Sequence, residues 1–175
     1  MRLGCINESE IIKQLRMDPM FRAINEIGLV ASKQVQGLTV SADGVVCFAH
    51  PSNAVDYLGA LEIKTRVSEG PIAAARKLQQ QVRGRWVLCV LGFRFVPRDH
   101  RSQVIHQAAV LGLSFALYVV ATLDAVLYGV VILVPADFRK AWLHSLRRYA
   151  EELVGWAYKA MKLRTDPEIC CSVLL

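Results

Sequence analysis

The sequence lacks the features that would mark a secreted, disulfide-bonded or zinc-binding protein. Its five cysteines are odd in number and never form a C-x-x-C pair, which argues against a disulfide framework and against a zinc site. The N-terminal segment has no apolar signal-peptide core, and the last residues form no prenylation box. We therefore expect an intracellular protein with reduced thiols, and the same features are compatible with a nuclear or a cytoplasmic location.

Long uncharged hydrophobic segments are also scarce. Residues 107–123 carry no charge and approach the lower length limit of a membrane-spanning helix, and further apolar residues follow at 125–134. Both parts are rich in β-branched and aromatic residues, which is typical of buried strands. We expect two strands, at 117–122 and 126–134, and no membrane partner; association with a membrane through this segment is the less favoured alternative.

The composition is that of one domain with a large core. The chain has 175 residues, of which 54% are hydrophobic, and it contains no internal repeat or low-complexity segment. A chain of this length buries roughly 70% of its unfolded surface. The net charge of +6 favours polyanionic partners without identifying one. We expect one domain at residues 1–163, followed by a loosely held tail at 164–175.

Two apolar segments each carry one acidic residue, and together they suggest a site. If both are strands of one hairpin, Glu62 and Lys64 share a sheet face because side chains alternate along a strand. Ile63 then points into a core on the other face, and Asp43 can join the charged pair from the neighbouring strand. The two segments are residues 41–48 and 59–65.

Two carboxylates and an ammonium on one sheet face are costly to bury unless other charges balance them. A divalent cation and a phosphate ester would do so, which is the chemistry of metal-dependent phosphodiester hydrolysis. Asp43 and Glu62 are candidate Mg²⁺ or Mn²⁺ ligands, together with the backbone carbonyl of Ile63. Lys64 would orient or deprotonate the attacking water. The simpler alternative for Glu62-Ile63-Lys64 is a solvated strand face, since this triplet alone is common.

The Asp43…Glu62-Ile63-Lys64 pattern resembles that of the PD-(D/E)XK nucleases. Ser41-Ala42-Asp43-Gly44 with Leu61-Glu62-Ile63-Lys64 is most similar to the lambda-exonuclease-like, YqaJ-type viral recombinases. The resemblance implies a restriction-endonuclease-like α/β fold, with a mixed β-sheet core flanked by helices. It also implies a magnesium-dependent deoxyribonuclease, exonuclease-like, that acts on DNA in recombination, repair or end processing. Some members form rings, so a homo-oligomer is possible.

The resemblance extends to two further segments. Arg2-Leu3-Gly4-Cys5-Ile6-Asn7-Glu8 is similar to a family segment whose glutamate completes the metal shell, which makes Glu8 the implied third carboxylate and Glu10 its competitor. The alternative for Glu8 is an acidic residue favoured by the helix dipole. Downstream, Gln103 matches a family glutamine and would hydrogen-bond the site lysine or the phosphate. The alternative for Gln103 and Gln107 is an ordinary polar helix face.

Two departures from the family pattern support a second hypothesis. Ala42 stands where the family has proline, and relatives carry further structure before the segment that contains Glu8. The alternative is therefore a truncated, catalytically inactive relative that binds nucleic acid or a partner. In either case we expect basic residues between the hairpin and the glutamine-bearing helix to contact DNA phosphates. These are Lys77, Arg83, Arg85, Arg94, Arg98 and Arg101.

Hydrophobic periodicity predicts the remaining elements. Helices are expected at 7–17, 72–82, 99–113 and 137–163, and a first strand at 21–32. The type of the buried-looking run at 86–93 is left open. The long C-terminal helix has an apolar stripe that we expect to pack on the core. Its members are Trp142, Leu146, Tyr149, Leu153, Trp156 and Ala160.

Overall fold

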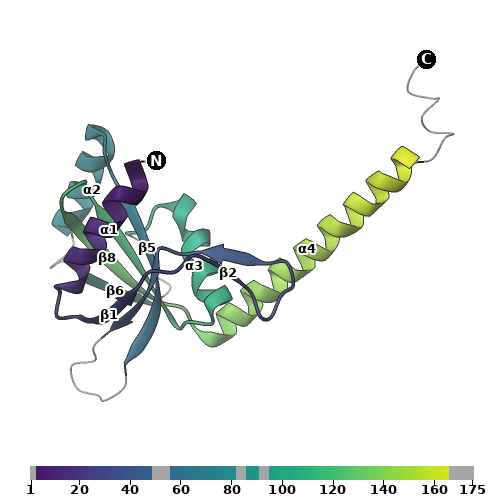
Figure 1. Ribbon diagram of the computed structural model, residues 1–175, viewed down its shortest axis with the longest axis horizontal. Coiled ribbons are helices and arrows are strands. Elements are labelled where there is room, and N and C mark those ends of the chain that lie inside the picture. Colours follow the sequence, from purple (N-terminus) through teal and green to yellow (C-terminus); the bar gives the residue numbers. More distant parts are fainter. Residues whose placement is uncertain (1–2, 49–55, 82–85, 91–94, 166–175) are drawn as a thin grey trace.

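The structure is a computed structural model that describes residues 3–48, 56–81, 86–90 and 95–165 (Figure 1). Its helices are α1 (Leu3–Arg16), α2 (Glu69–Gln81), α3 (Arg98–Leu111) and α4 (Ala136–Thr165). Its strands are β1 (Phe21–Asn25), β2 (Leu29–Ala31), β3 (Thr39–Ser41), β4 (Gly44–Phe48), β5 (Tyr57–Thr65), β6 (Trp86–Val90), β7 (Phe115–Ala121) and β8 (Val126–Leu133). All four expected helices and both late strands are present.

The central element is a mixed sheet with the strand order β1-β4-β5-β7-β8-β6. The pairs β1–β4, β4–β5 and β7–β8 are antiparallel, whereas β5–β7 and β8–β6 are parallel. Strands β2 and β3 form a separate antiparallel pair. The expected fold class, a mixed sheet flanked by helices with a long C-terminal helix, is confirmed.

The predicted single strand at 21–32 is wrong. The chain forms β1 and then β2, which belong to different sheets. The register explains the break. Asn25 of β1 pairs with Val45, and β4 begins at Gly44, so β4 has almost no further residues with which β1 could pair. The chain then turns away and pairs β2 with β3, leaving Leu29 exposed.

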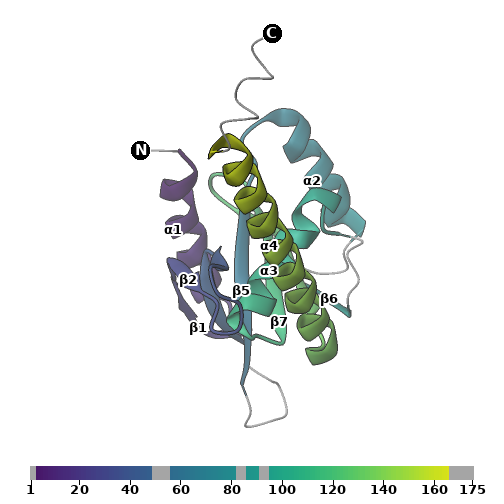
Figure 2. The ribbon, with the colours of Figure 1, turned by 90° about the vertical axis from the view of Figure 1, so that its right-hand side faces the viewer.

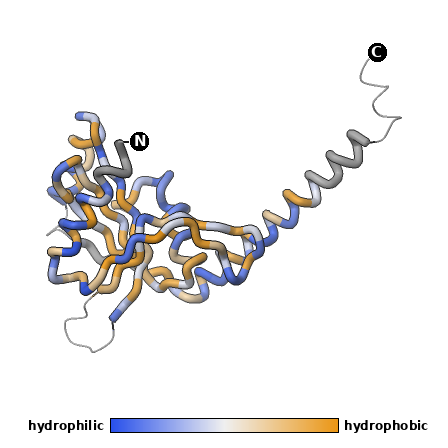
Figure 3. Tube along the Cα trace, viewed as in Figure 1, coloured by the Kyte–Doolittle hydropathy of each residue, from blue (hydrophilic) through white to orange (hydrophobic). Residues whose placement is uncertain are grey.

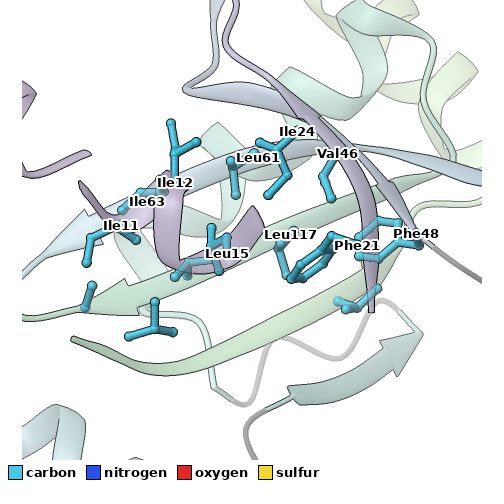
Figure 4. Close-up of a cluster of buried hydrophobic side chains, with 14 residues drawn as sticks. Ile11, Ile12, Leu15, Phe21, Ile24, Val46, Phe48, Leu61, Ile63 and Leu117 are labelled. Atoms are coloured by element: carbon cyan, nitrogen blue, oxygen red, sulfur yellow. The ribbon is translucent and has the colours of Figure 1, made fainter. Parts of the chain in front are cut away.

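Hydrophobic side chains pack on both faces of the large sheet. On one face, Ile11, Ile12 and Leu15 of α1 contact Leu61 and Ile63 of β5 (Figure 4). The other face packs against α2 and α3, so α1 lies on one side of β5 and α3 on the other (Figure 2). Burial of both faces accounts for the nearly continuous apolar sequence of β7 and β8. None of the helices in the described part of the chain combines the length and the hydrophobicity of a membrane-spanning segment.

Helix α1 is also fixed by the side-chain amide of Gln14, which both donates to and accepts from backbone groups, as a peptide group does. The Gln14 Nε2 donates to the Asp124 carbonyl at 2.7 Å, and the Val126 N–H donates to Gln14 Oε1 at 3.4 Å. These bonds join α1 to the turn between β7 and β8. The orientation of α1, and with it the position of Glu8, therefore depends on a contact far along the chain.

The run at 86–93, whose type the sequence left open, begins as strand β6. The Trp86 ring contacts Phe21 of β1 edge-on at 4.9 Å between centroids, and its Nε1 donates to Asp18 Oδ2 at 2.9 Å. Strands β1 and β6 are at opposite ends of the strand order, so this contact requires a strongly curved sheet. Gly129 of β8 pairs with Trp86 and leaves the space that the indole ring fills.

The prediction that the whole apolar stripe of α4 packs on the core is wrong. Leu143 is buried and Trp142 is half-buried, but Tyr149, Leu153 and Trp156 are 61%, 50% and 75% exposed. The helix continues past the sheet, so the described elements leave most of its distal half uncovered (Figures 1 and 3). Periodicity defines which residues share a side of a helix, but not how far the neighbouring surface extends. The Ala160 side chain and the tail at 166–175 lie outside the described residues.

Replacement of Gly129 by alanine should destabilise the fold. The new Cβ would overlap the six-membered ring of Trp86, so the indole must move away from Phe21 and Asp18. Overpacking of this kind costs about 1–3 kcal/mol, measured as the free energy of unfolding in urea. Gly70→Ala is the matched control, because no atom lies within 4 Å of its added Cβ. Equal stability of the two variants would contradict the packing described for Trp86.

Candidate active site

Asp43 is held beside β5 by two hydrogen bonds that extend the β4–β5 ladder. The ladder pairs Gly44 with Leu61 as its last partners, which confirms the expected antiparallel hairpin. The Asp43 N–H then donates to the Leu61 carbonyl at 3.0 Å, and the Ile63 N–H donates to Asp43 Oδ2 at 2.6 Å. Asp43 is thus anchored to the β5 backbone on either side of Glu62, through its N–H at Leu61 and through its carboxylate at Ile63.

Glu62 is a buried carboxylate, only 3% exposed, that faces α3. Gln103 Nε2 donates to its Oε1 at 2.8 Å, Gln107 Nε2 donates to its Oε2, and the Lys64 ammonium forms an ion pair with Oε1. Both carboxylate oxygens therefore accept from donors. Charge-assisted bonds of this kind offset the cost of burying the charge.

The alternation expected along β5 is confirmed. Glu62 and Lys64 lie on the same sheet face, and the Lys64 side chain is 25% exposed. Ile63 points to the opposite face, where it is 3% exposed within the core beside α1. A solvated strand face, the simpler alternative for this triplet, does not describe the buried Glu62.

Of the two N-terminal candidates, Glu8 is the one near this site. Its pKa is raised above the usual value, by partial burial and by the negative charge of Glu62, while Lys64 acts in the opposite direction. Glu10 instead forms an exposed ion pair with Lys13 at 3.1 Å. The structure thus brings Glu8 toward Asp43, Glu62 and Lys64, and its role as a metal ligand stays a prediction.

Burial raises the pKa of Asp43 to about 7, with the charges of Glu62 and Glu8 as further causes. The hydrogen bond from the Ile63 N–H and the positive charge of Lys64 oppose this rise. Three carboxyl groups therefore share a region with one ammonium, so negative charge is in excess there. A bound cation would relieve this excess.

The carboxylates of this site fit a hard cation that keeps several water ligands. They do not form a complete set of protein ligands around a metal. In the part of the chain that the structure describes, no three His, Cys, Asp or Glu side chains are grouped closely enough to hold a metal. Mg²⁺ needs no such cage, because it binds through one or two carboxylates and keeps several waters. Asp43 and Glu62 carry carboxylates of this kind, and their role as metal ligands stays a prediction. Ile63 gives its N–H to Asp43, and its carbonyl as a ligand stays a prediction.

Gln107 is a functional candidate that sequence reasoning assigned to an ordinary polar helix face. It is 1% exposed, and its Nε2 donates to both Glu62 and the Ser41 carbonyl, the latter at 3.1 Å. It therefore links the acidic strand to the segment that leads into Asp43. The signal was present in the sequence, since Gln103 and Gln107 are four residues apart and share one side of a helix. Gln103 bonds Glu62 rather than the lysine, because the carboxylate lies between them.

The basic residues proposed to contact DNA are partly described. Lys77 on α2 and Arg98 on α3 are exposed, and Arg101 Nε donates to the Val96 carbonyl at 3.0 Å. The other three candidates, Arg83, Arg85 and Arg94, lie outside the described residues.

Comparison with known proteins establishes the fold class. No protein-family model matches the chain, and no curated protein matches it by sequence. The solved structure of LHK-Exo in complex with dAMP is similar with a TM-score of 0.60 and 15% identity, covering 91% of this chain and 72% of that one. A second structure, an alkaline exonuclease (LHK-Exo) from Laribacter hongkongensis, gives a TM-score of 0.49 at 15% identity, with 89% and 73% covered.

The chain thus shares its mixed α/β fold with LHK-Exo, and this similarity confirms, at the level of the fold, the resemblance noted in the sequence.

Replacement of Gln107 by leucine should destabilise the protein through Glu62. The substitution removes a donor from a buried carboxylate while keeping a side chain of similar size. An unsatisfied buried charge costs about 1–3 kcal/mol or more, measured by urea unfolding at neutral pH. In a Glu62→Leu background, the same substitution should lower the free energy of unfolding much less. An equal loss in both backgrounds would show that Gln107 acts through packing alone.

Asp43 should make stability depend on pH in the absence of metal. Because its pKa in the folded state, about 7, exceeds the ordinary value of 3.8, the folded state binds more protons between these values. The stability of the wild type relative to Asp43→Asn should therefore be highest below about pH 4 and fall as the pH rises through about 7. Unfolding free energies measured across this range in EDTA test the slope. A stability difference that is constant or rises with pH would contradict the burial described for Asp43.

Proposed function

We propose that this protein is a metal-dependent DNA nuclease of the exonuclease kind that hydrolyses phosphodiester bonds in recombination or DNA end processing. The observation that carries the proposal is the meeting of Asp43 with Glu62 and Lys64 on one sheet face, with Glu8 nearby. The fold, shared with LHK-Exo, supports it, and that protein was crystallised with dAMP. A homo-oligomer, which the family resemblance implies, stays a prediction.

Each residue has a distinct part in the proposed reaction. Asp43 and Glu62 would hold Mg²⁺ or Mn²⁺, with Glu8 and the Ile63 carbonyl as further oxygen donors. Such an ion would acidify a bound water and offset phosphate charge. Lys64 orients or deprotonates the water and adds positive charge near the phosphate. Gln103 and Gln107 keep the Glu62 carboxylate in one orientation.

One observation favours the second candidate, a catalytically inactive protein that binds nucleic acid or a partner. Both oxygens of Glu62 already accept hydrogen bonds from glutamine amides, and one also pairs with Lys64. Glu62 is thus satisfied without a metal. Calorimetric titration with Mn²⁺ distinguishes the two functions, because the nuclease must bind the ion and the inactive protein need not.

Replacement of Lys64 by alanine should reduce metal-dependent DNA cleavage. The loss of a group that assists proton transfer lowers the rate by roughly 10²–10⁴-fold. The measurement is the release of nucleotides from a labelled linear duplex with Mg²⁺, compared with EDTA. Lys13→Ala is the matched control, because it removes an exposed lysine that pairs with Glu10.

Asp43→Asn should lose cleavage and weaken Mn²⁺ binding in the same preparation. Thermal unfolding of each variant separates a loss of chemistry from a loss of fold. The nuclease proposal fails if the folded wild type neither binds Mn²⁺ nor cleaves DNA. It fails also if Lys64→Ala and Lys13→Ala cleave at the same rate.

A further inference from the structure

We propose that α4 binds α4 of a second copy of this chain, as an antiparallel pair whose twofold axis passes between Tyr149 and Ala150. The inference goes beyond the proposed function and does not depend on it. Three features of the helix support it: an apolar side that the described elements leave uncovered, an order of charges that is complementary to itself when reversed, and space beside the contact.

The apolar side of α4 begins in the core and continues into solvent. Leu143 is buried together with Val35 and Ala109, and Trp142 packs against this cluster. At about 100° per residue, the apolar residues that follow lie within about 160° of the helix circumference. Leu146 and Ala150 are half-buried, and the others are exposed, namely Tyr149, Leu153, Val154 and Trp156. A continuous exposed apolar side of this kind marks an interaction surface.

The charged residues of this segment are complementary to themselves in reverse order. When the segment is read backwards, acidic residues take the places of basic ones: Leu146-Arg147-Arg148-Tyr149-Ala150-Glu151-Glu152-Leu153. In an antiparallel twofold pair, the same flank of each helix meets the same flank of the other copy. On one flank, Arg147 therefore faces Glu151 of the second copy. On the other flank, Arg148 faces Glu152. A parallel pair in register would instead put arginines beside arginines.

The charges determine the direction of the pair, whereas apolar contact supplies most of the affinity. Arg147 already pairs with Glu151 of its own helix at 3.0 Å. Among the residues that the structure describes, Arg148 and Glu152 form no such ion pair, so both are available to the second copy. Exposed ion pairs contribute little free energy each, but like charges in contact disfavour the wrong orientation. Burial of leucine, tyrosine and tryptophan side chains contributes more.

The surroundings of α4 leave room for a second helix. A groove of about 590 Å³ runs along the flank of Arg147 and Glu151, and Gln34 and Gln36 from the connection between β2 and β3 form its other wall. The small side chain of Ala150 at the crossing point lets the two helices approach closely. Each domain lies at the N-terminal end of its own helix (Figure 1). Because Ala136 is about 20 Å from the axis, the two helices begin about 40 Å apart.

The test measures the mass of the full chain in solution by light scattering over a range of protein concentrations. The wild type should change from the mass of one chain to that of two as the concentration rises. Arg147→Glu with Arg148→Glu should weaken dimerisation about hundredfold, because four attractive contacts become repulsive. Glu151→Arg with Glu152→Arg should do the same. Circular dichroism of each variant checks that the helix is retained.

The full exchange, with all four substitutions in one chain, is the matched control. It keeps the net charge at +6 and restores an opposite charge at every contact of the antiparallel pair, so it should dimerise like the wild type. A role of these residues in the single chain alone would not produce loss in both half exchanges and recovery in the full one.

A second arm tests the apolar contact. Leu153→Gln should weaken dimerisation at least about tenfold, because each dimer loses two buried leucines. His144→Gln, at an exposed position off the apolar side, should leave the dimer unchanged. Leu153 is exposed in the single chain, so its replacement should not alter thermal unfolding of the monomer. This arm decides the matter even if a half exchange fails to fold.

The inference is overturned if the wild type stays monomeric at every concentration or assembles into three or more copies. It is overturned also if the half exchanges and the full exchange associate alike, or if Leu153→Gln dimerises like His144→Gln. Because the substituted residues lie outside the carboxylate site, none of these outcomes depends on whether the protein cleaves DNA.

Discussion

The burial of one carboxylate, that of Glu62, determines how the elements around it are arranged. A charged group removed from water costs several kcal/mol unless donors surround it. The donors come from two elements: Lys64 from the same strand, and Gln103 and Gln107 from α3. Helix α3 must therefore lie over β5 with this one side turned toward it. Gln107 also reaches the carbonyl of Ser41, so the same requirement fixes the chain that leads to Asp43.

The site draws on segments that are far apart in the chain, and each is held by backbone geometry or by a polar contact. Asp43 is anchored by the N–H of Ile63, and α1 with its Glu8 is tied through Gln14 to the turn between β7 and β8. The two cations that follow Glu62 differ in their surroundings. Lys64 is paired with the Glu62 carboxylate, whereas Arg66 lies just beyond the end of β5 and lines a cavity together with residues of α2 and β8.

Much of this fold could be predicted from the sequence, because alternation along a strand is a local property. It was enough to place Glu62 and Lys64 on one face and Ile63 on the other, and to identify β7 and β8 as buried strands. It was not enough to find the role of Gln107, which depends on how α3 is rotated against the sheet. The division of residues 21–32 into β1 and β2 depends on where β4 begins, and the exposure of Trp156 depends on where the sheet ends. These are consequences of tertiary packing, which no local pattern contains.

The projecting half of α4 gives the molecule a markedly elongated shape (Figure 1). With 30 residues, the helix is about 45 Å long, whereas a compact protein of 175 residues has a radius of gyration of only about 16 Å. The particle therefore tumbles faster about the axis of α4 than across it. A spectroscopic label near the end of α4 would follow this anisotropic rotation while lying far from Asp43 and Glu62, and so would report on the hydrodynamics of the protein without disturbing its chemistry.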